Sequence, residues 1–359
     1  MILFKRYKLL LFLIVMLLCG TGLSAQEQAT PKNGEGIELF LKRFDREGAD
    51  YRKAFIQLNK GKFGKNYSLL RSVKYTLPPR TNSDTKKITQ PNNTAKPVTK
   101  AASAAAEPQQ RTRKNYQPLF GKALANYQVT SSELKGACFY LVSGHGGPDP
   151  GAIGQMNGHQ LHEDEYAYDI TLRLARVLLE KGAKVHIIIQ DAQDGIRNEP
   201  FLKNSKRETC MGNTIPFNQV SRLEQRVNQI NSLSKKDKEA YKRAIFLHID
   251  SRSKHQRTDV FFYYQQQKAA SKQLAKTMKE TFAYKYRHHQ PGRGFSGTVE
   301  GRNLYVLRHT TPISLFVELG NIQNAYDQQR FILSNNRQAL AKWIAEGFIK
   351  DYQQVKKKK

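Results

Sequence analysis

The sequence contains few cysteines and little negative charge. Of the three cysteines among 359 residues, Cys19 lies in the first apolar run, and only Cys138 and Cys210 lie beyond it. Two distant cysteines do not build a disulfide scaffold, and no C-x-x-C spacing typical of a metal site is present. The two thiols either pair in an oxidising compartment or are both free.

Acidic residues are scarce relative to basic ones. The chain has 30 Asp and Glu against 59 Lys and Arg, which gives a formal net charge of +29 and a pI near 10.0. Such a charge favours an anionic polymer as partner: nucleic acid, anionic lipid or an acidic cell-wall matrix. Charge alone does not choose among them.

The first 25 residues favour export. MILFKRYK supplies a basic start, LLLFLIVMLL a short apolar run and GTGLSAQ a small-residue exit with cleavage expected after Ala25. These features are typical of a secretory signal peptide. The run is shorter than the about 20 residues that a membrane anchor needs, and Leu18 before Cys19 argues against lipidation. Export makes nucleic acid a poor partner and leaves the polymers of the envelope.

The remaining chain divides by composition into two folded parts. In residues 33–79, GEGIELFLKRF and YRKAFIQLNK have helical patterns and SVKYTLPP has a strand-like one, and this order resembles the βααβ LysM module that binds peptidoglycan. The alternative is a small helical packing module without a ligand. Residues 80–116 have few large apolar side chains, which predicts a disordered basic linker. A second domain follows at 117–353, and a basic tail at 354–359.

The second domain alternates apolar runs with amphipathic helical patterns. The predicted strands are CFYLV, KVHIII, AIFLHI, DVFFYY, LYVL and ISLFVEL, and the helical patterns include EYAYDITLRLARVLLEKG, VSRLEQRVNQINSL and RQALAKWIAEGFIKDY. This alternation predicts an α/β fold, with a twisted and mostly parallel sheet covered by helices on both faces.

Polar residues follow the ends of several predicted strands. His145 lies in the glycine-rich loop SGHGGPDPGAIG, His248 and Glu318 lie at strand ends, and Glu163 opens the first long helix. Sites in open α/β sheets form beyond the carboxyl ends of strands, and two histidines with a carboxylate are a common zinc shell. His145, His248 and Glu163 each have an ordinary reading, as a turn residue, a core histidine and a helix N-terminal carboxylate. Glu318 is harder to explain in this way, because a buried carboxylate needs a partner or a raised pKa.

Four long blocks resemble the zinc-dependent N-acetylmuramoyl-L-alanine amidases of the Amidase_3 type. They are SGHGGPDPGAIG, HEDEYAYDITLRLARVLLEKGAKV, AIFLHIDS and LYVLRHTTPISLFVELGNIQN, in the family's order. The resemblance implies that His145, Glu163 and His248 bind one zinc ion and that Glu318 is the catalytic glutamate.

The sequence departs from the family pattern at three places. Val142-Ser143 stands where the family has Asp-Pro, Asp250 stands where asparagine is usual, and the loop before Glu163 is longer and contains His159 and His162. Either of these two histidines could replace a predicted ligand.

The resemblance implies an exported peptidoglycan amidase of the periplasm or cell wall. It would cut the bond between N-acetylmuramic acid and L-alanine during cell-wall remodelling or cell separation. Alternatives are a zinc peptidase acting on stem peptides and a non-catalytic wall-binding protein. Arg308 is expected to contact substrate or orient Glu318, with a structural salt bridge as the alternative. The long segment 191–219 could be a lid, a site for an activator protein or plain surface. Apart from that activator, peptidoglycan is the expected partner, without nucleic acid or a lasting membrane anchor.

Overall fold

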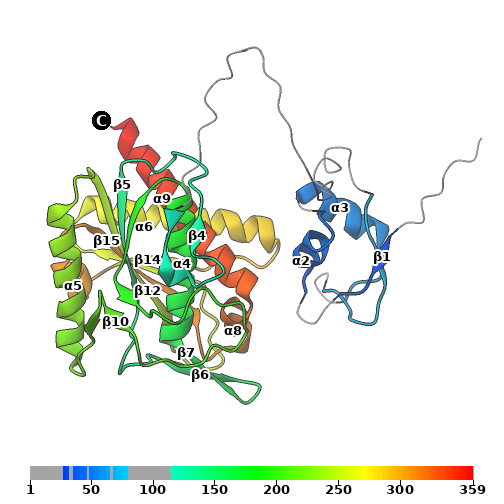
Figure 1. Cartoon of the computed structure of the whole chain (residues 1–359), viewed down its shortest axis with the longest axis horizontal. Helices are drawn as coiled ribbons and strands as arrows, with labels where there is room; N and C mark the ends of the chain where they lie inside the picture. Colours follow the sequence, from blue (N-terminus) through cyan, green and yellow to red (C-terminus); the bar gives the residue numbers. More distant parts are fainter. Residues whose placement is uncertain (1–26, 32–34, 47, 65–67, 80–114, 359) are drawn as a thin grey trace, which may run out of the picture. The chain divides into compact units, whose positions relative to one another are not determined.

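The protein forms two separate compact units. The computed structural model describes residues 27–31, 35–46, 48–64, 68–79 and 115–358, and contacts divide the chain into residues 1–105 and 106–359 (Figure 1). The predicted signal peptide and nearly all of the predicted linker lie outside the described residues. Within the described residues, no helix has the length and apolar character needed to cross a bilayer.

The N-terminal unit has the predicted βααβ order. Its elements are β1 (Gln28–Ala29), α2 (Ile37–Lys42), α3 (Ala49–Leu58) and β2 (Tyr75–Thr76), and β1 pairs with β2 in antiparallel orientation. Phe40, Phe55 and Tyr75 are fully buried and pack ring against ring at 5.4–5.9 Å. Three large aromatic side chains give this short segment a core of its own.

The second unit is built on a six-stranded sheet with the order β14-β13-β15-β12-β5-β8. The strands β5, β8, β12 and β15 are parallel, and β13 runs antiparallel to β15. After β5 the chain first adds β8 on one side and later β12 on the other, so the strand order reverses between β5 and β12. Ligands bind at such a switch point. The strands are β5 (Ala137–Ser143), β8 (Lys184–Ile187), β12 (Tyr241–Asp250), β13 (Phe261–Gln265), β14 (Thr298–Arg302) and β15 (Ile313–Asn321).

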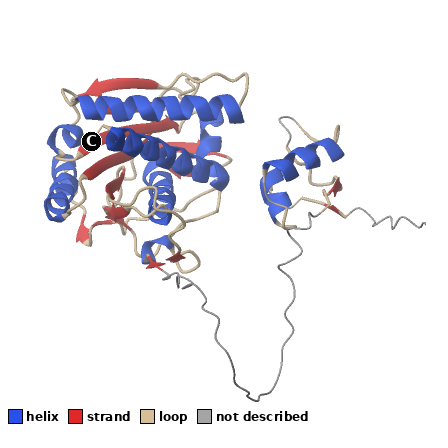
Figure 2. Ribbon diagram, turned by 90° about the horizontal axis from the view of Figure 1, so that it is seen from above, coloured by secondary structure: helices blue, strands red, loops and turns tan. Residues whose placement is uncertain are grey.

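Helices cover both faces of this sheet (Figures 1 and 2). The larger core packs alternate strand residues such as Phe139, Ile245 and Val317 against α4 (Glu163–Glu180), α6 (Ala269–His289) and α9 (Ser334–Lys357). The smaller core, on the opposite face, packs Tyr140 and Phe246 against α5 (Gln219–Lys236) and α7 (Tyr305–His309). The predicted fold class is therefore confirmed. Helix α8 (Ala325–Ile332) follows β15.

One strand prediction was wrong, and several other local features were not foreseen. LYVL is not a strand, because residues 305–309 form α7, where the neighbouring Val306 and Leu307 are both buried. A four-residue apolar run cannot distinguish a buried strand from a helical turn. Strand β14, whose sequence TVEGR has little apolar character, was not predicted. The last two residues of the expected linker, Asn115–Tyr116, form β3, which pairs with β4 (Asn126–Tyr127). Helix α9 continues into the basic tail as far as Lys357.

Candidate metal centre

Two histidines and a glutamate meet at the switch point of the sheet. His145 Nε2 lies 3.2 Å from Glu163 Oε2, and His248 Nδ1 lies 2.9 Å from Glu163 Oε1. One ligand atom from each of the three residues lies within 4.8 Å of the others. The structure therefore brings together three residues that are 18 and 85 positions apart in the chain.

The glycine-rich loop places His145 by means of an unusual backbone. His145 itself has a φ of 57°, a left-handed conformation that is uncommon outside glycine. Two glycines leave space for the cluster, because a Cβ on Gly144 would lie 2.5 Å from His248 Nδ1 and one on Gly151 would lie 2.7 Å from Glu163 Oε2. Glycine is therefore required beside the cluster as well as in the turns of the loop.

Asp149 holds the other nitrogen of the His145 ring. Its Oδ2 lies 2.9 Å from His145 Nδ1 and also accepts a 2.7 Å hydrogen bond from Arg222. Arg226 donates a hydrogen bond to the carbonyl oxygen of His145. A carboxylate on the distal imidazole nitrogen fixes the tautomer that leaves Nε2 free for a metal. Asp149 was not predicted from the sequence; its position four residues after His145 is the feature that could have indicated it.

Glu163 opens α4 in the pocket between the two histidines. Its oxygens accept hydrogen bonds from the backbone N–H groups of Ala152 (2.9 Å) and Ile249 (3.0 Å). Burial would raise the pKa of Glu163, but its hydrogen bonds to His145 and His248 outweigh burial and hold that pKa well below its usual range. The carboxylate is therefore kept ionised.

The two histidines have opposite pKa shifts. Burial opposes protonation of His145, yet the hydrogen bonds to Asp149 and Glu163 prevail and raise its pKa to about 10. Burial lowers the pKa of His248, in spite of Glu163. The two carboxylates beside His145 thus favour a positive charge at its ring.

Glu318 faces the same centre from β15. It is the register partner of His248 in the parallel pair β12–β15, so the two side chains project from the same face. Its Oε2 is buried and has no hydrogen-bond partner among the described residues. Burial, followed by the charges of Glu163 and Asp250, raises the pKa of Glu318 well above its usual value. Such a carboxyl group is suited to accept and release protons.

The residues fit a zinc ion. Zinc takes imidazole nitrogen and carboxylate oxygen ligands at about 2.0–2.2 Å, so ligand atoms 2.9–3.2 Å apart can share one ion. Nε2 of His145, the ionised Glu163 and His248 supply a suitable donor set, and Glu318, whose Oε2 has no hydrogen-bond partner among the described residues, lies beside it.

Two other groups of described residues have the composition of metal ligands. One consists of Cys138, His186 and Asp237, and the other of Asp164, Glu165 and Glu208. In the second group each carboxylate is engaged: Asp164 and Glu165 accept backbone N–H groups, and Glu208 accepts the N–H of Gly147 at 2.8 Å. Glu208 therefore supports the glycine-rich loop.

The structure separates the cluster from the other histidines that the sequence offered. His159 and His162 lie in β7 (His159–His162), which pairs with β6 (Ile153–Met156), and neither belongs to the group around Glu163. His159 stacks on Phe201 at 4.0 Å instead. Burial lowers the pKa of His162.

Arg308 lies in α7 and is exposed. Its Nε hydrogen-bonds His309 Nε2 at 3.1 Å, and no ion pair with a carboxylate is formed within the described part of the chain. A structural salt bridge is therefore not observed, and substrate contact stays a prediction. Cys138 and Cys210 are both buried and free, which settles the alternative left open by the sequence.

The segment 191–219 is tied to the body of the domain. Arg337, a fully buried residue of α9, donates hydrogen bonds to the carbonyl oxygens of Arg197 and Glu199. Further along, β10 (Thr209–Cys210) pairs with β11 (Asn213–Thr214) and with β9 (Ile189–Gln190). Much of this segment therefore forms structure that the sequence pattern did not reveal.

The chain is similar to one family in sequence and to several solved structures. Residues 140–350 match the family described as N-acetylmuramoyl-L-alanine amidase. A comparison with curated protein sequences gave no match. Solved structures with a similar chain path include the amidase Ami1 from Mycobacterium smegmatis (19% identity, 62% of this chain and 99% of that chain covered, TM-score 0.46). Others are the catalytic domain of CwlV from Bacillus (Paenibacillus) polymyxa var. colistinus (22%, 61% and 99%, 0.44) and AmiC2 of Nostoc punctiforme (20%, 61% and 99%, 0.44).

Proposed function

Because the chain belongs to the N-acetylmuramoyl-L-alanine amidase family, we propose that it hydrolyses peptidoglycan with one zinc ion held by His145, Glu163 and His248. The bond cut joins the lactyl group of N-acetylmuramic acid to L-alanine. The observation that carries the proposal is the cluster itself, whose three ligand atoms meet beside Glu318, a residue whose buried Oε2 has no hydrogen-bond partner within the described chain.

Glu318 is the proton carrier in this proposal. Zinc, when bound, supplies a Lewis acid that polarises the scissile carbonyl and lowers the pKa of water. Glu318 accepts the proton of the attacking water and then delivers it to the nitrogen of the leaving amine. Its raised pKa supports both roles, because such a carboxyl group takes up a proton more readily than an ordinary carboxylate and can pass it on.

Asp149 and the glycine-rich loop position the site. Asp149 holds Nδ1 of His145, so that the ring presents Nε2 to the metal in a fixed orientation. Pro148 and Pro150 restrict the backbone on either side of Asp149. A stiff loop keeps a ligand within the small tolerance of metal geometry.

Mass spectrometry of the products from purified peptidoglycan, with and without a chelator, tests this function. An amidase releases peptides with a free L-alanine amine and leaves intact glycan, whereas a zinc peptidase cuts within the stem peptide. We expect amidase products that disappear with the chelator and return with added zinc. Wall binding without any hydrolysis would contradict the proposal and favour a non-catalytic wall-binding protein.

We extend the proposal to the N-terminal unit and to the location of the protein. The βααβ order supports a LysM-like unit that holds the enzyme on peptidoglycan, and deletion of residues 27–79 should weaken cosedimentation with purified sacculi. A signal peptide cleaved after Ala25 would direct the chain to the periplasm or cell wall, for a role in cell-wall remodelling or cell separation. N-terminal sequencing of the mature protein tests that step. An activator protein that binds near 191–219 stays a prediction.

A further inference from the structure

A cavity of about 180 Å³ opens beside the proposed metal centre, between α5 and α7. Its lining includes both histidines of the cluster, so any group that enters it lies next to the reacting bond. Two arginines of α5 meet aromatic side chains across this space. The residues that matter here are His145, His248, Arg222, Arg226, Tyr305 and Phe316.

Arg226 has a buried charge without a counterion. Only 3% of the residue is exposed, and its one side-chain hydrogen bond goes to the carbonyl oxygen of His145. Its Nε is buried without a partner, and no carboxylate pairs with it in the described ranges. A buried guanidinium in this state is costly, so the site favours an incoming anion.

Arg222 adds a second positive charge to the same cavity. It pairs with Asp149 at 2.7 Å, and that carboxylate is also shared with His145. The lining of the cavity thus contains one carboxylate, that of Asp149, and two arginines. The charge of the cavity is therefore complementary to an anionic group of the substrate.

We propose that this cavity binds a free carboxylate of the stem peptide, at the acidic residue that follows L-alanine. This inference rests on the proposed function. Once the lactyl group is in amide linkage, an N-acetylated glycan strand has no free carboxylate, so the anion must come from the peptide. A glutamate joined through its side chain leaves its main-chain carboxylate free, only one residue from the scissile bond.

The size of the cavity agrees with this occupant. A water molecule takes about 30 Å³ of liquid volume, so the cavity has room for roughly six waters, or for a carboxylate with the few carbons that carry it. Arginine binds carboxylate through parallel N–H groups, and such charge-assisted hydrogen bonds are stronger than neutral ones. Arg222 and Arg226 then determine specificity for the peptide.

Two muramoyl peptides that differ at one group test the proposal. One has D-isoglutamate after L-alanine and the other has D-isoglutamine, in which the carboxylate is replaced by a carboxamide. We expect the wild-type enzyme to cleave the carboxylate form with a kcat/KM at least about tenfold higher. Equal kcat/KM values would overturn the subsite, while no hydrolysis of either peptide would overturn the proposed function as well.

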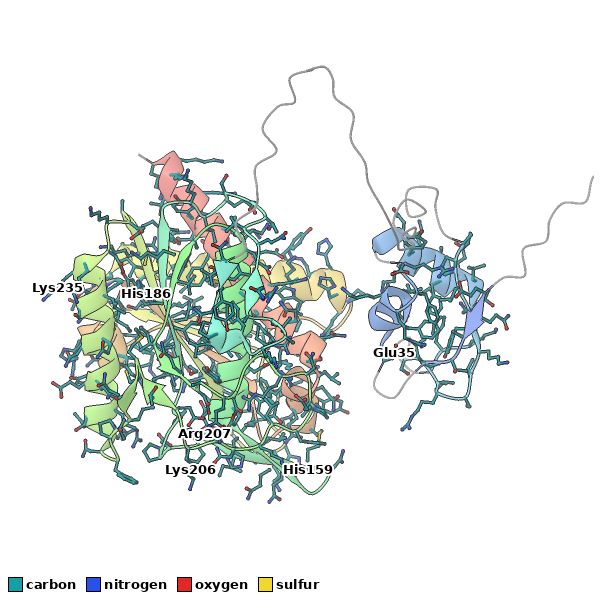
Figure 3. All side chains as sticks on the ribbon, viewed as in Figure 1. Glu35, His159, His186, Lys206, Arg207 and Lys235 are labelled. Carbon is teal, nitrogen blue, oxygen red and sulfur yellow. The ribbon has the colours of Figure 1, made fainter. Side chains whose placement is uncertain are left out.

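Arginine variants separate substrate binding from support of the loop. In Arg226→Gln and Arg222→Gln the ratio between the two peptides should fall towards one, whereas loss of loop support alone would slow both peptides equally and leave the ratio unchanged. Lys235→Gln, in the last turn of α5, is the control for net charge and should keep the wild-type ratio (Figure 3). If an arginine variant does not fold, the corresponding L-alanyl dipeptides should still inhibit the wild type unequally, the carboxylate form more strongly. Equal inhibition would contradict the proposal.

Discussion

Three clusters of described residues have the composition of a metal site, and two of them contain histidine; we propose that only one of these two holds an ion. His145, Glu163 and His248 meet beyond the carboxyl ends of the central strands. Cys138, His186 and Asp237 meet further back in the sheet: Cys138 is the second residue of β5, about 17 Å of strand from its end.

The second cluster already neutralises its own carboxylate. Asp237 accepts hydrogen bonds from Tyr140 (2.6 Å) and Lys184 (2.6 Å to the other oxygen), and His186 Nε2 lies 3.0 Å from it. Burial raises the pKa of the Cys138 thiol to about 12, so the thiolate that a metal needs is disfavoured. The ammonium group of Lys184 thus already supplies a positive charge to the Asp237 carboxylate, where a metal ion would otherwise do so.

The first cluster leaves its charge open. No lysine or arginine in the described part of the chain pairs with Glu163, whose contacts there are the two histidines and backbone N–H groups. The backbone at His145 is in the left-handed region, and glycines leave room for the side chains of the cluster. The buried Oε2 of Glu318 beside them has no hydrogen-bond partner among the described residues. Uncompensated charge and local backbone strain, more than residue types, thus favour the first cluster over the second as the metal site.

Removing a histidine from each cluster should have the largest and most unequal effects. His145→Ala is expected to lose bound zinc and all amidase activity, because one of three protein ligands is gone. His186→Ala is expected to keep both. Metal analysis of the purified variants checks this, with peptidoglycan hydrolysis as the second measurement. A His186 variant without zinc would reverse the assignment.

Glu318→Gln should separate chemistry from metal binding. Loss of the proton carrier is expected to lower kcat by about 10²–10⁴-fold, while the zinc content stays that of the wild type. The isosteric amide keeps the shape of the side chain. Full activity in this variant would contradict the role of Glu318.

Asp149→Asn should have an intermediate effect. The variant cannot hold His145 by a charged hydrogen bond, and loss of such a partner weakens metal affinity or activity by about 10–100-fold. Titration with a competing chelator measures the affinity. Unchanged zinc affinity and activity would show that Asp149 does not position the ligand.

Asp237→Asn should affect only stability. Replacing a carboxylate that receives several donors is expected to lower the free energy of unfolding by about 1–3 kcal/mol, with zinc content unchanged. Burial would raise the pKa of Asp237, but the hydrogen bonds from Lys184 and Tyr140 outweigh it and lower the pKa from 3.8 to about 2. The ionised form therefore stabilises the fold above about pH 4, and this contribution is lost as the pH falls towards 2. Urea unfolding at several pH values should show the difference between wild type and variant narrowing on acidification; a constant difference would contradict this account.

The sequence predicted the fold class from its alternating apolar and helical patterns, and the family resemblance implied the roles of the four residues of the proposed site. One physical rule had made three of them candidates. Parallel strands end at the same edge, so His145, His248 and Glu318 had to lie near one another. Arg222 and Arg226 could not be predicted, because they reach the loop from α5, more than 70 residues away. That the Nε of Arg226 is buried without a hydrogen-bond partner in the described structure follows only from the packing. Helix α7 was mistaken for a strand because a short apolar run has too few residues to show a helical or strand period.

X-ray absorption at the zinc edge of the purified wild-type protein tests the central claim most directly. Ligation by His145, Glu163 and His248 predicts a shell of nitrogen and oxygen alone, at about 2.0–2.2 Å. Ligation at the other cluster would add the sulfur of Cys138 at about 2.3 Å. A shell without sulfur is the expected result, and a sulfur ligand would contradict the assignment.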